Sequence, residues 1–271
     1  MENKYILNQG ESDTKRLDSL SEIYDNNSKK FIIENIAENS VAKIIDVGCG
    51  QGSITKFFAN QYPNAKVIAL DISQDQLVIS KNKMINETNI EYLSVDIESD
   101  SITSELWEKL QSADLIYIRY LLLHLKKWEI FFDNIYKILK KGGQIIIEEP
   151  GFPWITYPYS ETLQKASVAA QKLLHNLNYK FDCIPHLWEF LNQQNQFKIK
   201  NVDFSHPILK TYNQKSLMWM SFAQIKEPLI KAKVYDEVEF NNIVSELKKI
   251  AEDPKYIGIS LRLIQLHLEK I

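Results

Sequence analysis

Residues 45–52 read Ile-Asp-Val-Gly-Cys-Gly-Gln-Gly, and this stretch decides the fold. An apolar run precedes it and an amphipathic segment follows it, so the pattern predicts a strand, a glycine-rich turn and a helix. Gly48, Gly50 and Gly52 stand where the backbone must turn sharply and where a ligand can approach it closely. Free N–H groups at the start of the following helix favour an anionic or electron-rich group. The stretch therefore predicts a ligand-binding loop.

From the strand before this loop to residue 148, short apolar runs alternate with amphipathic segments of helical periodicity. The apolar runs lie at residues 41–47, 66–70, 90–95, 115–118 and 144–148. Strands that alternate with helices form βαβ units, which build a parallel sheet covered by helices on both faces. The fold class is therefore α/β, with a doubly wound sheet.

Acidic residues stand where the second and third apolar runs end. Asp71 follows Gly52 by nineteen residues, a spacing at which a carboxylate can accept hydrogen bonds from both hydroxyls of a ribose. Asp96 ends the third run at the same edge of the sheet, within reach of an adenine amino group. The alternative is the dinucleotide site of an NAD-dependent oxidoreductase, but Ser53 stands where the third glycine or alanine of that motif belongs. The spacing favours a different nucleoside cofactor.

Residues 41–149 resemble the class I S-adenosylmethionine-dependent methyltransferases. The resemblance is carried by Ile45 to Gly52, by Ala69-Leu-Asp71, by Val95-Asp-Ile97 and by the Leu-Lys-Lys-Gly-Gly-Gln-Ile of residues 139–145. It implies a Rossmann-like sheet of seven strands whose last strand is antiparallel, with S-adenosyl-L-methionine as the cofactor. It also implies a helical cap or lid and the transfer of a methyl group.

The motifs and their neighbours define the expected cofactor site. We expect it to contain Tyr5, Arg16, Asp46, Gly48, Cys49, Gly50, Gly52, Asp71, Ile72, Asp96, Ile97 and Arg119. Tyr5 and Arg16 belong to an opening segment that resembles the cap of some small-molecule methyltransferases, which folds over the bound cofactor. Arg16 would then face the cofactor's carboxylate; a solvated arginine on a surface helix is the alternative.

The flanking segments suggest a division of the chain into parts. We expect an N-terminal helical cap at residues 1–40 and the cofactor-binding core at 41–149. Helical lid or substrate insertions are expected at 150–180 and 205–252, and the core sheet is completed by 181–204 and 253–271.

Methyl transfer is an in-line displacement at an activated carbon, so it requires alignment of the reactants and, for some acceptors, a base. His124 and Glu149 follow the fourth and fifth strands, where ligands of doubly wound sheets bind, and they are the candidate catalytic residues. Each has a structural alternative: a histidine that holds its loop, and a carboxylate paired with a lysine. His175 is the next candidate histidine.

Aromatic residues concentrate outside the predicted core. Tyr120, Phe152, Trp154, Tyr157 and Trp219 are the candidate substrate-binding residues, because aromatic rings line apolar pockets; core packing is the alternative. The expected acceptor is the oxygen or nitrogen of a small, apolar or aromatic molecule. A protein acceptor and a binding module without turnover are the other possibilities.

Composition excludes several partners. The net charge is −3 and the longest runs of lysine are short pairs, which disfavours nucleic acid. Cys49 and Cys183 lack metal-ligand spacing, so no metal is expected. The polar amino terminus and the absence of a long apolar run predict no membrane span and a cytoplasmic protein. The sequence leaves the oligomeric state open.

Overall fold

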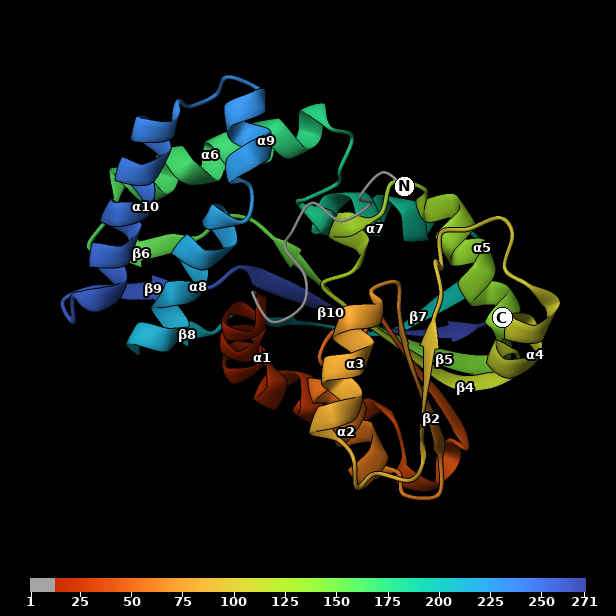
Figure 1. Ribbon diagram of the computed structural model, residues 1–271. Coiled ribbons are helices and arrows are strands. Elements are labelled where there is room, and N and C mark those ends of the chain that lie inside the picture. Colours follow the sequence, from red (N-terminus) through yellow and green to blue (C-terminus); the bar gives the residue numbers. More distant parts are fainter. Residues whose placement is uncertain (1–12) are drawn as a thin grey trace.

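The computed structural model describes residues 13–271, and its centre is a seven-stranded sheet (Figure 1). The strands lie in the order β3 (Ile90–Ser94), β2 (Lys66–Asp71), β1 (Lys43–Val47), β4 (Ala113–Arg119), β5 (Leu139–Gly151), β10 (Arg262–Lys270) and β7 (Phe197–Ser205). Neighbours from β3 to β5 pair in parallel, whereas β10 pairs antiparallel with both β5 and β7. The predicted doubly wound α/β sheet with an antiparallel last strand is thus confirmed.

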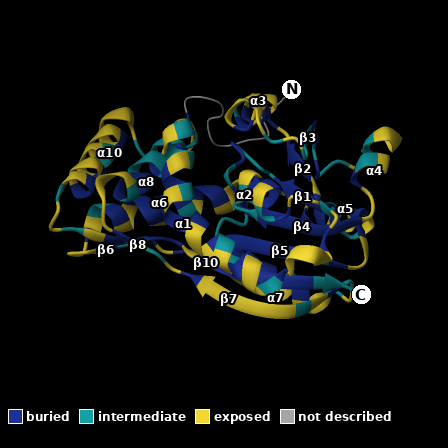
Figure 2. Ribbon diagram, turned by 90° about the horizontal axis from the view of Figure 1, so that it is seen from below, coloured by how far each residue is buried: buried dark blue, intermediate teal, exposed yellow. Residues whose placement is uncertain are grey.

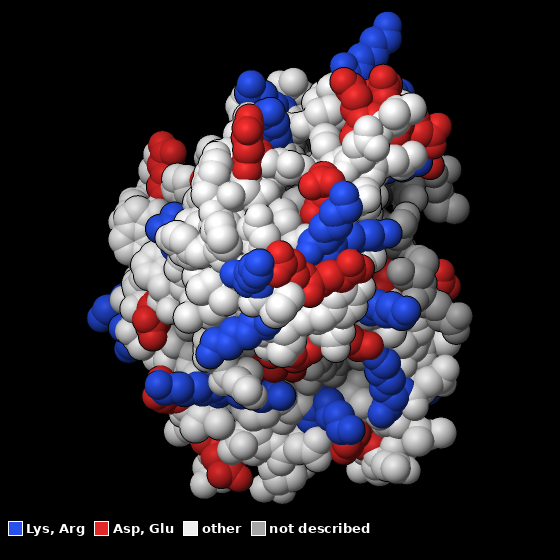
Figure 3. Space-filling model, turned by 90° about the vertical axis from the view of Figure 1, so that its left-hand side faces the viewer, with Lys and Arg blue, Asp and Glu red and all other residues white. Residues whose placement is uncertain are grey.

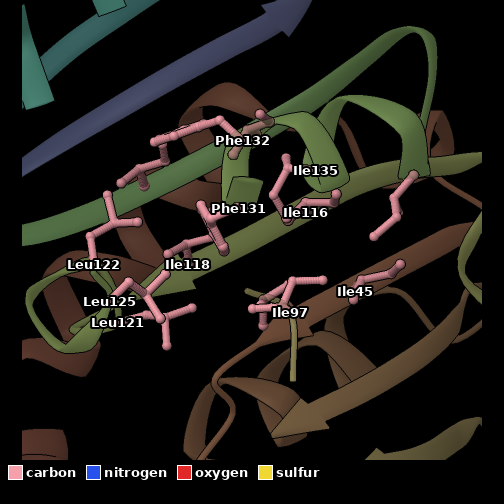
Figure 4. Close-up of a cluster of buried hydrophobic side chains, with 14 of the residues drawn as sticks. Ile45, Ile97, Ile116, Ile118, Leu121, Leu122, Leu125, Phe131, Phe132 and Ile135 are labelled. Carbon is pink, nitrogen blue, oxygen red and sulfur yellow. The ribbon is translucent and has the colours of Figure 1, made fainter. Parts of the chain in front are cut away.

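Helices cover both faces of this sheet, which explains why its central strands are almost wholly apolar. One face packs against α4 (Ser104–Leu110), α5 (Trp128–Ile138) and α7 (Cys183–Gln193), and Figure 4 shows part of this cluster. The other face packs against α2 (Ser53–Gln61) and the end of α1 (Thr14–Asn35). Alternation along β1 divides the two clusters, because Ile45 faces the first and Ile44 the second. Figure 2 shows the buried strands between more exposed helices.

Shorter elements complete the core. Helix α3 (Gln74–Lys83) lies against β2 and β3, and the turns η2 (Glu38–Ser40) and η3 (Leu122–His124) precede β1 and follow β4. The side chain of Ser73 caps α3 by accepting a hydrogen bond from the N–H of Gln76. Residues 140–143 lie within β5, where Gly142 takes a φ of +70°.

A second body, here called the lid, lies beside the carboxyl ends of the central strands (Figure 1). It consists of α6 (Glu161–Asn176), α8 (Tyr212–Ala223), α9 (Lys226–Lys231), α10 (Glu237–Glu252) and a sheet of β6 (Ile155–Tyr157), β9 (Ile257–Ile259) and β8 (Ile208–Leu209). The lid has its own apolar cluster. Capping boxes start α8 at Thr211 and α10 at Asp236. The small sheet was not predicted, and the last two strands of the chain, β9 and β10, belong to different sheets.

Helix α1 joins the two bodies. Its first half packs into the lid cluster through Leu20, Ile23 and Tyr24, and its second half packs under the central sheet through Phe31 and Ile32. The hydroxyl of Tyr24 donates a hydrogen bond of 2.9 Å to the carbonyl of Leu261. One wall of the space between core and lid is therefore held by a helix that is anchored on both sides.

Candidate functional site

A cavity of about 570 Å³ lies between the carboxyl ends of the central strands and the lid. Its volume is within the range of pockets that enclose small molecules and cofactors. Of the residues predicted from the sequence, its lining includes Arg16, Asp46, Gly48, Cys49, Gly50, Gly52, Asp71, Arg119, Tyr120, His124, Phe152 and Trp154. The fold thus gathers into one cavity side chains that lie far apart in the sequence.

The glycine-rich loop forms the cavity wall at the end of β1. Gly48, Gly50 and Gly52 have φ values of +74°, +53° and +80°, which glycine adopts without steric cost. A Cβ atom built on Gly50 would meet nothing within 4 Å, so the loop offers bare backbone there. By contrast, a Cβ on Gly52 would lie 2.3 Å from the Ser80 hydroxyl, so this glycine permits close packing of the loop on α3.

Asp71 clamps this loop from the end of β2. Its Oδ2 accepts a 2.9 Å hydrogen bond from the N–H of Gly50, and its Oδ1 accepts one of 2.8 Å from the N–H of Ser73. Burial raises the pKa of Asp71 above its ordinary value, whereas these N–H groups lower it. Each carboxylate oxygen has a second lone pair, so the side chain can still accept hydrogen bonds from a ligand's hydroxyl groups.

Asp46, at the end of β1, links the glycine-rich loop to α2. It is 3% exposed, and its Oδ2 accepts a 2.6 Å hydrogen bond from the hydroxyl of Thr55 on α2. Burial raises the pKa of Asp46 to about 6. The carboxyl group therefore ties β1 to α2 across the loop, which keeps the start of that helix facing the cavity.

A second cavity of about 40 Å³ adjoins the first. Ile72, Asp96 and Ile97 line it, and it shares Gly48 and Asp71 with the larger cavity. Residues from the ends of β1, β2 and β3 thus meet around a narrow, partly apolar space beside the Asp71 carboxylate.

Arg16 and Arg119, the two arginines expected at the cofactor site, each form an ion pair with an aspartate. Arg16 makes two 2.6 Å hydrogen bonds to Asp13, whose side chain also accepts one of 3.2 Å from Gln224 at the end of α8. Arg119 lies 3.0 Å from Asp25 of α1. Both arginines line the cavity, but each guanidinium is oriented by its ion pair. Tyr5 lies outside the described residues.

The candidate catalytic residues have different surroundings. His124 lines both cavities, and burial lowers its pKa to about 3, with Arg16 adding to this effect. Its imidazole is therefore uncharged at neutral pH. Glu149 lies outside the cavity lining, and its Oε1 accepts 2.8 Å hydrogen bonds from the N–H groups of Leu121 and Leu122. We therefore correct the expectation for Glu149, since its position makes it an anchor of the loop after β4.

Replacing Glu149 with glutamine is expected to remove a pH-dependent loss of stability. Burial raises the pKa of Glu149 from 4.5 to about 8, so the folded protein holds this proton more tightly than the unfolded chain does. The group's contribution to the free energy of unfolding is full below about pH 4.5 and is lost as the pH rises to about 8. Glutamine stays uncharged, so the variant should gain stability over wild type as the pH rises through this interval.

Chemical denaturation at about pH 5 and about pH 9 measures the difference. The control is Glu161→Gln on the surface of α6, where Lys165 lowers the carboxyl pKa, so glutamine should bring no gain at high pH. An advantage of Glu149→Gln that grows toward low pH would contradict the assignment.

Three of the five predicted substrate-binding residues line the cavity and two do not. Tyr120, Phe152 and Trp154 line the cavity. Tyr157 does not, because β6 pairs it with Ile257 on the outer sheet and leaves it 57% exposed. Trp219 does not either, because it faces away from the cavity on α8.

Whether a residue of α6 or α8 reaches the cavity depends on the face of the helix on which it lies. The ammonium of Lys248 on α10 lies 4.6 Å from the centre of the Trp219 ring. Met218 and Phe222, on the other face of α8, line the cavity in its place. His175 is exposed at the end of α6 and lies outside the lining.

Sequence reasoning missed the contribution of α6. Leu163, Ala166, Ala170 and Leu174 follow one another at three- and four-residue spacing and all line the cavity. This periodicity predicts a helix face that is buried, but two alanines among leucines do not indicate whether that face meets a protein core or a ligand.

Gln51 and Lys83 were missed too. The amide of Gln51 donates to the Thr14 hydroxyl of α1 at 2.9 Å and accepts from the Lys83 ammonium at 2.7 Å. These bonds tie the glycine loop, α1 and α3 together at the cavity edge. No local sequence pattern predicts these bonds, because Thr14, Gln51 and Lys83 come from separate segments of the chain and meet only in the folded protein.

Within residues 13–271, no helix combines the length and the hydrophobicity needed to cross a membrane. In the same part of the chain, histidine, cysteine and acidic side chains do not gather into groups of three or more that could hold a metal ion.

Comparisons with known proteins agree with this geometry. Residues 45–145 match the family model described as a methyltransferase domain. (S)-coclaurine N-methyltransferase of Thalictrum flavum subsp. glaucum is 27% identical over 118 residues, which are 43% of this chain and 31% of that protein. Malonyl-[acyl-carrier protein] O-methyltransferase 2 of Ilyobacter polytropus is 28% identical over 111 residues, 41% of this chain and 40% of that protein. The chain thus spans less than half the length of these curated relatives.

A solved structure shares the fold over most of the chain. Phosphoethanolamine N-methyltransferase 2 of Haemonchus contortus, in complex with phosphomonomethylethanolamine and S-adenosylhomocysteine, superposes with a TM-score of 0.51 at 15% identity. The superposition covers 89% of this chain and 52% of that one.

Proposed function

This chain carries a class I S-adenosylmethionine-dependent methyltransferase domain, and we propose that it transfers the methyl group to an oxygen or nitrogen atom of a small molecule. The observation that carries the proposal is the two-sided cavity. One side presents the glycine-rich loop and Asp71, and the other side presents the apolar lid. The curated relatives are named for N- and O-methylation, which is the same pair of acceptor atoms.

The residues around the glycine loop fit the cofactor. Backbone N–H groups of the loop and the start of α2 would receive the cofactor's amino acid part, and Asp71 would accept hydrogen bonds from its ribose hydroxyls. Ile72, Asp96 and Ile97 line the smaller cavity beside Asp71 and would contact the adenine from that side. When bound, S-adenosylmethionine supplies a methyl group that is already activated by the neighbouring sulfonium.

Alignment and exclusion of water are the protein's part in this reaction. The lid and α1 would enclose the acceptor, while Tyr120, Phe152 and Trp154 would pack against it. We assign to His124 the orientation of the acceptor, because an imidazole with a pKa of about 3 is a weak base at neutral pH. Residues 150–180 and 205–252 would thus serve as the substrate part of the chain.

Calorimetric titration with S-adenosylmethionine and with S-adenosylhomocysteine tests this proposal. Both should bind to the glycine-loop side with one site per chain, whereas NAD, the matched alternative for a nucleoside-binding loop, should give no heat of binding. A chain that unfolds cooperatively, and is therefore folded, but binds neither sulfur compound would refute the proposal. Binding of NAD in their place would support an oxidoreductase.

A further inference from the structure

Charge is distributed unevenly around the large cavity. Among the described residues, its charged lining residues all come from positions 13–119. Every lining residue from Tyr120 to Leu261 is uncharged, including His124, whose pKa of about 3 keeps the ring neutral. The outer surface of the lid is different: Figure 3 shows acidic and basic side chains interspersed on it. The lid is therefore uncharged toward the cavity, and its lining residues on α6 and α8 are apolar except for Ser167 and Ser221.

The uncharged side forms a distinct part of the cavity, here called the acceptor lobe. It is defined by Leu163, Ala166 and Ala170 of α6 and by Leu217, Met218 and Phe222 of α8. None of these six side chains is more than 8% exposed. A ligand that enters the lobe would exchange water for hydrocarbon on both sides, which favours apolar surface and disfavours an unpaired charge.

At the border of the lobe the charges are already neutralised. Asp13 and Arg16 pair with each other, and Gln224 donates an additional hydrogen bond to Asp13. A charged acceptor would have to break this pair or remain without a partner in the lobe, and both are costly. The border therefore offers no attraction for a charged tail.

The two alanines create the open space in the lobe. Ala166 and Ala170 are one turn apart on α6 and are 2% and 8% exposed, whereas their neighbours on the same face, Leu163 and Leu174, carry longer side chains. A methyl group at these positions occupies little of the cavity, which Met218 of α8 also lines. A larger side chain would extend from α6 into the cavity.

We propose that the acceptor carries an uncharged, largely hydrocarbon tail, which lies between α6 and α8, and that Ala166 and Ala170 determine the length of tail that fits. The inference rests on the proposed function for the identity of the ligand as a methyl acceptor. Its physical content is a ligand-binding lobe, so binding measurements without turnover can test it separately.

The first test is a binding series on the wild-type protein saturated with S-adenosylhomocysteine. The neutral fluorescent probe N-phenyl-1-naphthylamine is displaced by hexanol, octanol and decanol, and by octanoate and octylammonium. Each added methylene in the alcohols should tighten binding by about two- to fourfold. Octanol should compete at least about tenfold better than either charged compound of the same length.

The second test is Ala166→Phe. This variant should bind decanol about tenfold or more weakly than wild type, and it should no longer bind decanol more tightly than octanol. Its affinity for S-adenosylhomocysteine should stay within about twofold of wild type. Val168→Phe is the matched control, because it adds a phenyl group to the same helix at a position that is 36% exposed. The affinities of that variant for hexanol, octanol and decanol should equal those of wild type. If Ala166→Phe does not fold, Ala170→Phe and the wild-type series provide the same test.

The outcomes separate the two proposals. Equal competition by octanol and octylammonium, or no dependence on chain length, would overturn the acceptor-lobe inference even if S-adenosylhomocysteine binds. If the wild-type protein does not bind S-adenosylhomocysteine, the series is measured on the free protein. An intact chain-length series would then overturn the proposed function and leave the apolar lobe as a binding site for another ligand.

Discussion

Asp71→Ala is expected to weaken the binding of S-adenosylhomocysteine by at least about tenfold, or about 1.4 kcal/mol. Two effects combine in this variant. The cofactor's ribose would lose the acceptor of its hydroxyl groups, and the glycine loop would lose the hydrogen bond that the N–H of Gly50 donates to Asp71. The N–H of Ser73 would lose its partner as well, so the turn before α3 would loosen. The binding surface is therefore damaged together with the direct contact.

Calorimetry on the purified variant measures this change, and two further variants make it specific. Asp75→Ala removes the same charge four residues later, from the exposed first turn of α3, and should leave the affinity within about twofold of wild type. Asp71→Asn keeps a carbonyl oxygen and should lie between wild type and Asp71→Ala. An unchanged affinity in folded Asp71→Ala would mean that the ribose contact is misassigned.

Trp128→Ala is expected to lower the free energy of unfolding by about 3–5 kcal/mol. Trp128 is fully buried at the start of α5, within the cluster of which Figure 4 shows a part. Its indole N–H donates a 3.0 Å hydrogen bond to the carbonyl of Leu122. The ammonium of Lys180 lies 4.4 Å from the centre of the ring. The substitution would leave a cavity in the core and would also release the loop that carries His124.

Denaturant unfolding followed by circular dichroism gives the stability difference. Trp188→Ala is the matched control, because Trp188 is 42% exposed on α7 and its loss should cost far less. Trp128→Phe separates packing from hydrogen bonding, since it should cost about 1 kcal/mol for the lost bond in addition to a smaller change in packing. Similar losses in Trp128→Ala and Trp188→Ala would contradict the central role given to Trp128.

The glycine-loop side of the cavity was predictable because its signals are local. The glycines at positions 48, 50 and 52 and the acid at the end of β2 each belong to a strand–turn junction, and the parallel topology then brings those junctions to one edge. Glu149 shows the limit of this reasoning. A carboxylate at the end of β5 can face the cavity or the neighbouring loop, and hydrogen bonds to two N–H groups from that loop decided its position.

The acceptor half was less predictable for a related reason. Trp154 lines the cavity and Tyr157 does not, although only two residues lie between them in one aromatic segment. The difference arises because β6 pairs with β9, a strand about a hundred residues later in the chain, and this pairing turns Tyr157 outward. Ala166 and Met218 line the cavity for the same reason, because the fold brings α6 and α8 to it.

The sequence by itself therefore determined the α/β class and the glycine-rich loop with Asp71 at the end of the next strand, because these depend on periodicity and on residues close to one another in the chain. The antiparallel last strand was expected from the resemblance to the methyltransferase family. The tertiary structure alone decided the separation of charged from uncharged cavity walls, the anchoring role of Glu149 and the lobe opened by Ala166. Those features depend on which distant helices and strands meet. Such contacts are set by the packing of the whole chain.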